Sequence, residues 1–185
     1  MNKTLRSLLG GLLLAGLWSV APVRTAYAAA SDDLTITVTP IADVSLILNT
    51  STYAFGPLAV NASSASATAL TLTNSGQVSV TVDKRIVAES DPIGWTASTS
   101  VGRDAYVLYC ATSTTRLSLG SFTAATRFGA QNAISDLTGP GGAKPVLPTS
   151  GLGSSVDLRF RLDTPSEVSS SAARTITVRF TGLAE

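Results

Sequence analysis

The sequence lacks histidine altogether and has a single cysteine among its 185 residues. Without histidine, the chain has none of the side chains that most often act as a general base, assist a nucleophilic serine or bind zinc. Cys110 has no partner for an intrachain disulfide and lies in an apolar run. That setting predicts a buried, unreactive thiol, although pairing with another chain stays open. We therefore expect no enzyme, no metal site and no cofactor.

Charged residues are also few, at 14% of the chain, and 13 basic residues nearly balance 12 acidic ones. The longest basic run is Lys84-Arg85. Binding to nucleic acid or to an anionic membrane surface depends on clustered positive charge. Neither is therefore expected as a partner.

No apolar run in the sequence is long enough to span a membrane, which takes about 20 residues. The longest covers residues 8–20, follows two basic residues and precedes Ala26-Tyr27-Ala28. This order of a positive start, a short apolar stretch and a small-residue site is typical of a secretory signal peptide. We predict that residues 1–28 are cleaved off. Residues 29–185 would then be exported to the periplasm, the cell surface or the medium, with no transmembrane span.

The exported part alternates apolar and polar residues, as β-strands with one buried face do. No stretch shows helical periodicity, and turn residues separate the strands. Seven to nine short strands predict an all-β fold, an antiparallel Ig-like β-sandwich, in one domain over residues 29–185. The predicted strands cover residues 34–38, 41–48, 53–55, 70–73, 78–82, 105–111, 117–119, 156–162 and 175–181.

Two connections have distinctive composition. Asn74-Ser75-Gly76-Gln77 has turn chemistry, because Asn and Gly tolerate positive φ, and it predicts a β-hairpin between residues 70–73 and 78–82. Residues 139–153 are rich in glycine and proline. They predict an exposed, flexible excursion from the domain.

Two of these stretches resemble a motif of bacterial Ig-like modules. In those modules an aromatic-Phe-Gly strand precedes an L-T-L-T-N-x-G hairpin, and this chain has Tyr53-Ala54-Phe55-Gly56 and then Leu70-Thr71-Leu72-Thr73-Asn74-Ser75-Gly76. With Trp95 and residues 159–178, the exported part is similar to a group of short exported bacterial proteins that carry one such domain. The resemblance implies the sandwich fold and no defined activity.

Two other families show weaker resemblance. The chain resembles chaperone-usher pilins in size, export and alternating terminal strands, but it lacks their usual cysteine pair. It resembles WxL-type cell-wall surface proteins in its export and β-rich character. Trp95, however, is followed by Thr96-Ala97 rather than by the Trp-x-Leu signature.

The N-terminal segment, residues 34–38, is the first candidate site. It is short and amphipathic, and Pro40 separates it from the next predicted strand. An N-terminal strand of an Ig-like sandwich lies at a sheet edge, where unpaired N–H and C=O groups can pair with another chain. Leu34, Ile36 and Val38 are thus candidates for strand exchange between copies, which would form fibres or a surface layer. The alternative is that the segment packs within its own domain.

Trp95, Tyr106 and Tyr109 are candidates for a platform on which a sugar stacks, and the alternative is that these aromatics belong to the core. Four charged residues share one face of a predicted strand, where an ion-pair ladder with Arg179 is favoured over a ligand site. These four are Asp157, Arg159, Arg161 and Asp163.

The sequence as a whole predicts a non-catalytic, exported structural or cell-surface protein that associates with itself. A module that binds a glycan or another surface polymer is the alternative.

Overall fold

The computed structural model describes residues 35–39, 41, 43–89, 94–151 and 153–185. Leu34 and the predicted signal peptide lie outside the described residues. The chain divides into two compact units, Met1–Thr39 and Pro40–Glu185. Residues 35–39 contain no strand. The strand predicted at residues 34–38 is therefore absent from its described part, because alternation defines an amphipathic face but supplies no neighbouring strand to pair with.

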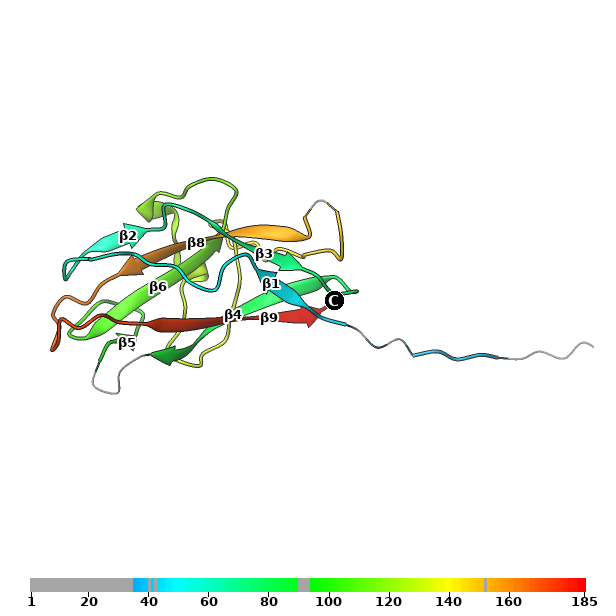
Figure 1. Ribbon diagram of the computed structural model, residues 1–185, viewed down its shortest axis with the longest axis horizontal. Coiled ribbons are helices and arrows are strands. Elements are labelled where there is room, and N and C mark those ends of the chain that lie inside the picture. The colour runs from blue at the N-terminus through cyan, green and yellow to red at the C-terminus, as the bar shows by residue number, and fades with distance from the viewer. Residues whose placement is uncertain (1–34, 40, 42, 90–93, 152) are drawn as a thin grey trace, which may run out of the picture. The chain divides into compact units, whose positions relative to one another are not determined.

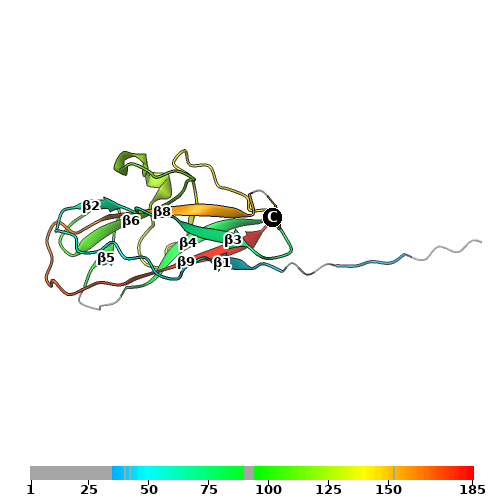
Figure 2. The same cartoon turned by 45° about the horizontal axis from the view of Figure 1, so that its top comes forward.

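The unit Pro40–Glu185 consists of two β-sheets (Figures 1 and 2), which confirms the predicted all-β sandwich. Its described strands are β1 (Leu46–Leu48), β2 (Ser63–Ala65), β3 (Leu70–Asn74), β4 (Val80–Glu89), β5 (Thr96–Ala97), β6 (Ala105–Thr112), β7 (Ser135–Asp136), β8 (Ser155–Asp163) and β9 (Ile176–Ala184), with short 3-10 turns η1 (Leu119–Ser121) and η2 (Ala124–Thr126).

The first sheet has the order β1-β3-β8-β6-β5, with β2 also pairing with β8, and the second has the order β7-β4-β9. All pairs are antiparallel except β5 with β6. An Ig sandwich places strands A-B-E-D in one sheet and C-F-G in the other. Taken in chain order, β1, β3, β4, β6, β8 and β9 occupy positions A to F of that arrangement.

The core lies between the sheets and is built by period-2 alternation. On β4, Val80, Val82 and Ile86 face inward and are 0–1% exposed. On β8, Leu158, Phe160 and Leu162 face the same core. Intervening residues on both strands are more exposed, so each strand presents one apolar and one polar face.

Two predicted strands are not strands. Residues 53–55 are irregular although Phe55 still packs against the core, because the chain turns at Gly56, which has a φ of 75°, and Pro57 has no N–H to donate. Residues 117–119 end in the 3-10 turn η1. Of the predicted strand 41–48, only β1 forms within the described residues.

The predicted hairpin at residues 74–77 is wrong, because this turn carries the chain from β3 in the first sheet to β4 in the second. The Asn74 side chain is buried, and its Nδ2 donates to the carbonyl oxygens of Val78 at 2.9 Å and Leu147 at 2.9 Å. Its Oδ1 accepts from the Gly76 N–H at 2.9 Å. Hydrogen bonds from the Asn74 side chain to the backbone of Gly76, Val78 and Leu147 thus hold the turn between the two sheets.

The predicted excursion at residues 139–153 is not wholly exposed. Leu147 is fully buried in the core. Its backbone N–H donates to the Val80 carbonyl at 2.8 Å and its carbonyl accepts from the Val80 N–H at 3.0 Å. One apolar residue among glycines and prolines is therefore enough to anchor this connection to β4.

We expect Asn74→Ala to lower the free energy of unfolding by about 2–4 kcal/mol, because it removes the side-chain donor to the Val78 and Leu147 carbonyls and the acceptor of the buried Gly76 N–H. Urea unfolding of residues 29–185, followed by Trp95 fluorescence, measures the change. Ser75→Ala is the matched control, since the Ser75 hydroxyl makes an exposed hydrogen bond to Ser45. It should change the free energy by no more than about 0.5 kcal/mol. Equal effects of the two substitutions would contradict the role of Asn74.

Candidate functional site

The described part of the N-terminal segment exposes its apolar side chains. Ile36 is 75% exposed and Val38 is 76% exposed. Thr35 and Thr37, which alternate with them, are exposed as well. An alternating segment that buries neither of its faces is available to pair with a strand elsewhere.

The second sheet ends at β9, which pairs with β4 from Ile176 opposite Glu89 to Ala184 opposite Val80. No strand of the described residues pairs with the other side of β9. In the Ig arrangement that side belongs to strand G. We call residues 176–180 on this side the open edge.

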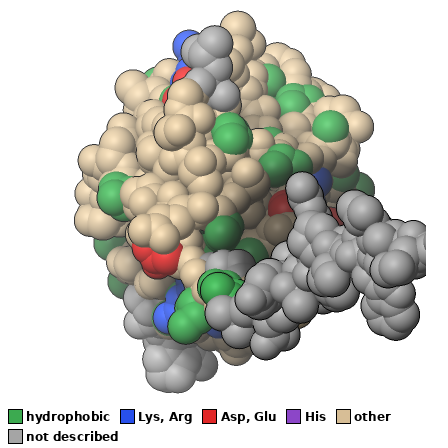
Figure 3. All heavy atoms as spheres, turned by 90° about the vertical axis from the view of Figure 1, so that its right-hand side faces the viewer, with side chains coloured by type: hydrophobic (Ala, Val, Ile, Leu, Met, Phe, Trp, Pro, Cys, Tyr) green, Lys and Arg blue, Asp and Glu red, His purple; other side chains and the backbone are tan. Residues whose placement is uncertain are grey.

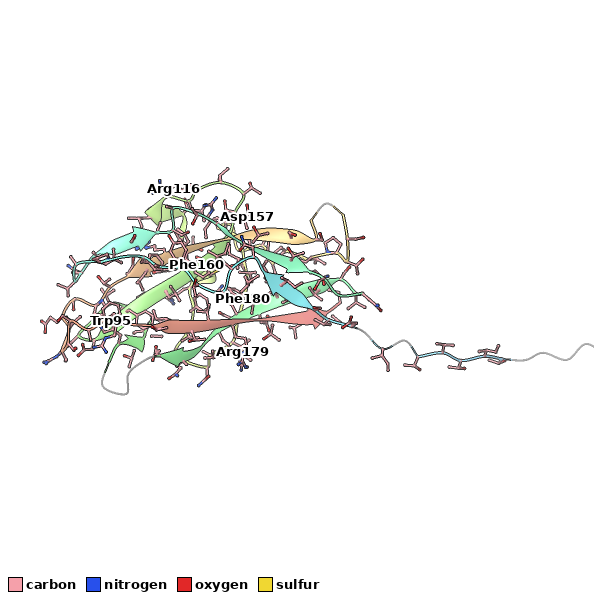
Figure 4. The ribbon with its side chains drawn as sticks, viewed as in Figure 1. Trp95, Arg116, Asp157, Phe160, Arg179 and Phe180 are labelled. Carbon is pink, nitrogen blue, oxygen red and sulfur yellow. The ribbon has the colours of Figure 1, made fainter. Side chains whose placement is uncertain are left out.

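The inward face of the open edge is only half-buried. Ile176, Val178 and Phe180 pack against the core, yet none of them is fully buried. On β4, the residues opposite Val178 and Phe180 are Ile86 and Lys84, and both are buried. Figure 4 shows Phe180 and Arg179 on opposite sides of β9, with Phe180 directed toward the other sheet. Apolar surface therefore remains uncovered along the same edge whose backbone groups lack a strand partner.

The other end of β9 is covered on its inward face by residues at and just before β1. A Cβ atom at Gly182 would lie 2.8 Å from Val44 Cγ1 and 3.4 Å from Leu46 Cδ1. Glycine is thus required there for the close approach of these two side chains. The uncovered stretch of the inward face therefore lies before Gly182.

The three predicted stacking residues do not form one platform. Tyr106 is fully buried, packs on Trp95 with ring centroids 6.1 Å apart, and donates its hydroxyl to Glu89 Oε1 at 2.7 Å. Burial, reinforced by that hydrogen bond, raises the pKa of Tyr106. Tyr109 lies three positions along β6, so it points to the opposite face and contacts the Arg161 guanidinium, 5.0 Å from its ring.

The predicted charged face exists on β8, but its pairing differs from the expectation. Arg161 makes two hydrogen bonds to Asp163 on the same strand, at 2.7 and 2.8 Å. Asp157 accepts from the Thr71 hydroxyl at 3.1 Å. Arg179 lies on β9 in the other sheet, so it cannot belong to a ladder with these residues.

Sequence reasoning missed a buried cation at Lys84. Its side chain is fully buried, its Nζ donates to the Asp136 carbonyl at 2.6 Å, and it lies 5.6 Å from the centre of the Phe128 ring. Burial lowers the pKa of Lys84 from its ordinary value. The sequence did indicate this burial, because Lys84 lies an even number of positions from Val80 and Val82 and therefore faces the same side of the strand.

Cys110 is buried, as predicted, and burial raises the pKa of its thiol to about 12. A thiol with that pKa stays protonated at neutral pH and is a poor nucleophile. The described residues contain no group of three or more His, Cys, Asp or Glu side chains placed to hold a metal ion. Within the same residues, no helix is long and apolar enough to cross a membrane.

A shallow hollow of about 500 Å³ lies beside β2. The Arg116 guanidinium at its wall (Figure 4) and serine hydroxyls can bind polar groups. On the face shown in Figure 3, hydrophobic side chains are scattered among polar ones and few charges are visible. The residues that line the hollow are Ser63, Ser64, Ala65, Arg116, Leu117, Ser118 and Leu119.

Comparisons with protein-family models, with curated proteins and with solved structures found no match to this chain.

The lowered pKa of Lys84 predicts a pH dependence of stability. Between its folded pKa and the ordinary value of 10.5, the unfolded chain binds a proton that the folded chain does not. Stability contributed through this group therefore rises with pH up to about that value. We expect the free energy of unfolding of the natural protein, minus that of Lys84→Met, to increase from pH 7 toward pH 10.5.

Urea unfolding at a series of pH values measures this difference. Other titrating groups, such as Tyr106, are present in both proteins, so their contributions cancel in the difference between the two free energies of unfolding. Lys144→Met is the matched control, because hydrogen bonding to Asp136 raises the pKa of Lys144. Its difference should stay nearly flat up to about pH 10.5 and fall only above that value, because the folded and unfolded chains both bind this proton below it. A difference for Lys84→Met that is flat or falls with pH would contradict the prediction.

Proposed function

We propose that this protein is an exported structural or cell-surface protein that associates with itself by β-strand pairing. The observation that carries the proposal is the exposed, alternating N-terminal segment, in which Ile36 and Val38 are about three-quarters exposed. The open edge of β9 supports it, since the same fold holds a strand that has a pairing partner on one side only among the described residues. An exposed segment and an unpaired edge are the two parts that strand addition requires.

The energetics make pairing with a sheet edge more favourable than simple apolar contact. Burying Leu34, Ile36 and Val38 would contribute about 1.5–3 kcal/mol for each side chain. Ordering five residues costs about 1–2 kcal/mol for each residue. These two amounts roughly offset each other. Ladder hydrogen bonds, at about 0.5–1.5 kcal/mol each, then decide whether the segment associates.

No observation favours the glycan-binding alternative over this proposal. Trp95 and Tyr106 pack on one another, and the buried Tyr106 ring offers no face to a sugar. Tyr109 points to the other face of β6, where it contacts Phe122 and Arg161. We propose no catalytic activity for the chain.

The proposed site of action is outside the cytosol, and this part of the proposal rests on the sequence of residues 1–28. We expect the protein recovered from the periplasm, cell surface or medium of its natural host to begin at Ala29. Mass spectrometry of the intact protein after cell fractionation measures this directly. Recovery of the chain from the cytosol with residues 1–28 still attached would contradict export.

We expect residues 29–185 to form concentration-dependent oligomers. Ile36→Ser with Val38→Ser should weaken association at least about a hundredfold, because it removes about 3 kcal/mol or more of apolar burial. Thr35→Ser with Thr37→Ser is the matched control, with two changes in the same segment that leave the apolar face intact. Sedimentation velocity over a range of concentrations gives the association constants.

A mature chain that remains monomeric at its highest soluble concentration would overturn the proposed function. Oligomers that are equally stable with both pairs of substitutions would show that the N-terminal segment is not the contact.

A further inference from the structure

We infer that the open edge of β9 is the acceptor for the N-terminal segment of a second copy of this chain, which would occupy the position of the missing strand G. This inference rests on the proposed function and adds to it the surface that receives the segment. The contact is a β-ladder between two copies, with residues 34–38 of one beside residues 176–180 of the other.

The two stretches have matching sequences. Thr-Ile-Thr-Val occurs as residues 35–38 and again as residues 175–178. In β9, the apolar members of this pattern face the core and the intervening Thr177 is exposed. A neighbouring strand with the same alternation would place its apolar residues beside Ile176, Val178 and Phe180. Its threonines would then face solvent together with Thr177 and Arg179.

The open edge offers the incoming segment apolar contacts and backbone hydrogen bonds, and the exposed segment lacks both. Its inward side chains are half-buried, whereas the core-facing side chains of β4 are 0–1% exposed. An added strand would cover them, because adjacent strands lie about 4.8 Å apart and their side chains on one face touch. The backbone groups on that side of β9 would gain partners in the same step.

The number of half-buried positions on β9 fits the number of apolar residues in the segment. Gly182 is covered by Val44 and Leu46 of the same unit. Before it, three inward side chains are half-buried, Ile176, Val178 and Phe180. The segment has three apolar side chains, Leu34, Ile36 and Val38. Pro40 follows the segment in the sequence and has no N–H to donate to a ladder, so it limits pairing beyond the C-terminal end of the segment.

The charges also favour this acceptor. Residues 34–39 carry no charge, and Asp32-Asp33 precedes them. The open edge carries one charged residue, Arg179, on its outward face. An acidic pair of residues near a basic strand is favourable. A second copy of this chain thus fits the edge in pattern, in the number of apolar residues and in charge.

Disulfide trapping between two differently tagged copies tests the inference. One copy of residues 29–185 carries Thr37→Cys, and the other carries Arg179→Cys or Thr177→Cys. All three positions face solvent, so the substitutions leave the core intact. The native Cys110 is buried and does not compete for the new bond.

We expect a mixed disulfide between the two tags, at least tenfold faster than with a partner carrying Ser63→Cys. Ser63 is the matched control, because it is exposed on β2, another short strand that pairs on one side with β8. The preferred partner, residue 177 or 179, reports the strand direction. Adding Ile36→Ser and Val38→Ser to the Thr37→Cys copy should abolish the preference.

Three outcomes would overturn the inference. If the chain forms oligomers but the mixed disulfide forms equally fast at β2 and at β9, this acceptor is rejected and the proposed function stands. A Thr37→Cys, Arg179→Cys double variant that closes within one monomer would show that the segment fills its own edge. A chain that is monomeric and shows no trapping would reject both the acceptor and the proposed function.

Discussion

The structure depends on the requirement of strand backbones for hydrogen-bonded neighbours, which strands at a sheet edge, such as β1 and β9, meet on one side only among the described residues. β8 meets it most fully, because β6 lies on one side and β2 and β3 lie on the other. Its inward residues are accordingly well buried. β9 meets the requirement on one side only within the described residues, and its inward residues are correspondingly half-buried. Pairing and burial thus vary together across the sandwich, as expected when side-chain cover comes from the neighbouring strand.

The strands that sequence patterns predicted well are those with strong local alternation or a long apolar run. Residues 105–111, 156–162 and 175–181 all lie within strands of the structure to within one residue at their starts. The connection at residues 74–77 was misjudged because its conformation depends on Leu147, which is 73 positions away from Asn74. Turn chemistry predicts that a chain reverses, but it does not show whether the next strand joins the same sheet.

The candidate site also combines one feature that the sequence predicts with one that it does not. The amphipathic character of residues 34–38 is a local property and was visible in the sequence. The open edge of β9 was not, because an unpaired side is a property of the whole strand order. The predicted stacking platform failed for a local reason. Residue type indicated that Trp95, Tyr106 and Tyr109 lie together, but Tyr106 and Tyr109 are three positions apart on β6, so their rings lie on opposite faces of the sheet. Lys84 shows that strict parity places even a cation in the core when the rest of its strand face is apolar.

The edge on β9 and the segment at residues 34–38 are different parts of one chain, and this difference has a consequence for any assembly that they build. A contact between unlike surfaces is heterologous: it closes when two or more copies exchange segments in a ring, and otherwise it extends into an open filament. In an open filament, every added copy consumes one segment and presents one new edge. Its two ends are therefore chemically distinct, so elongation has a built-in polarity.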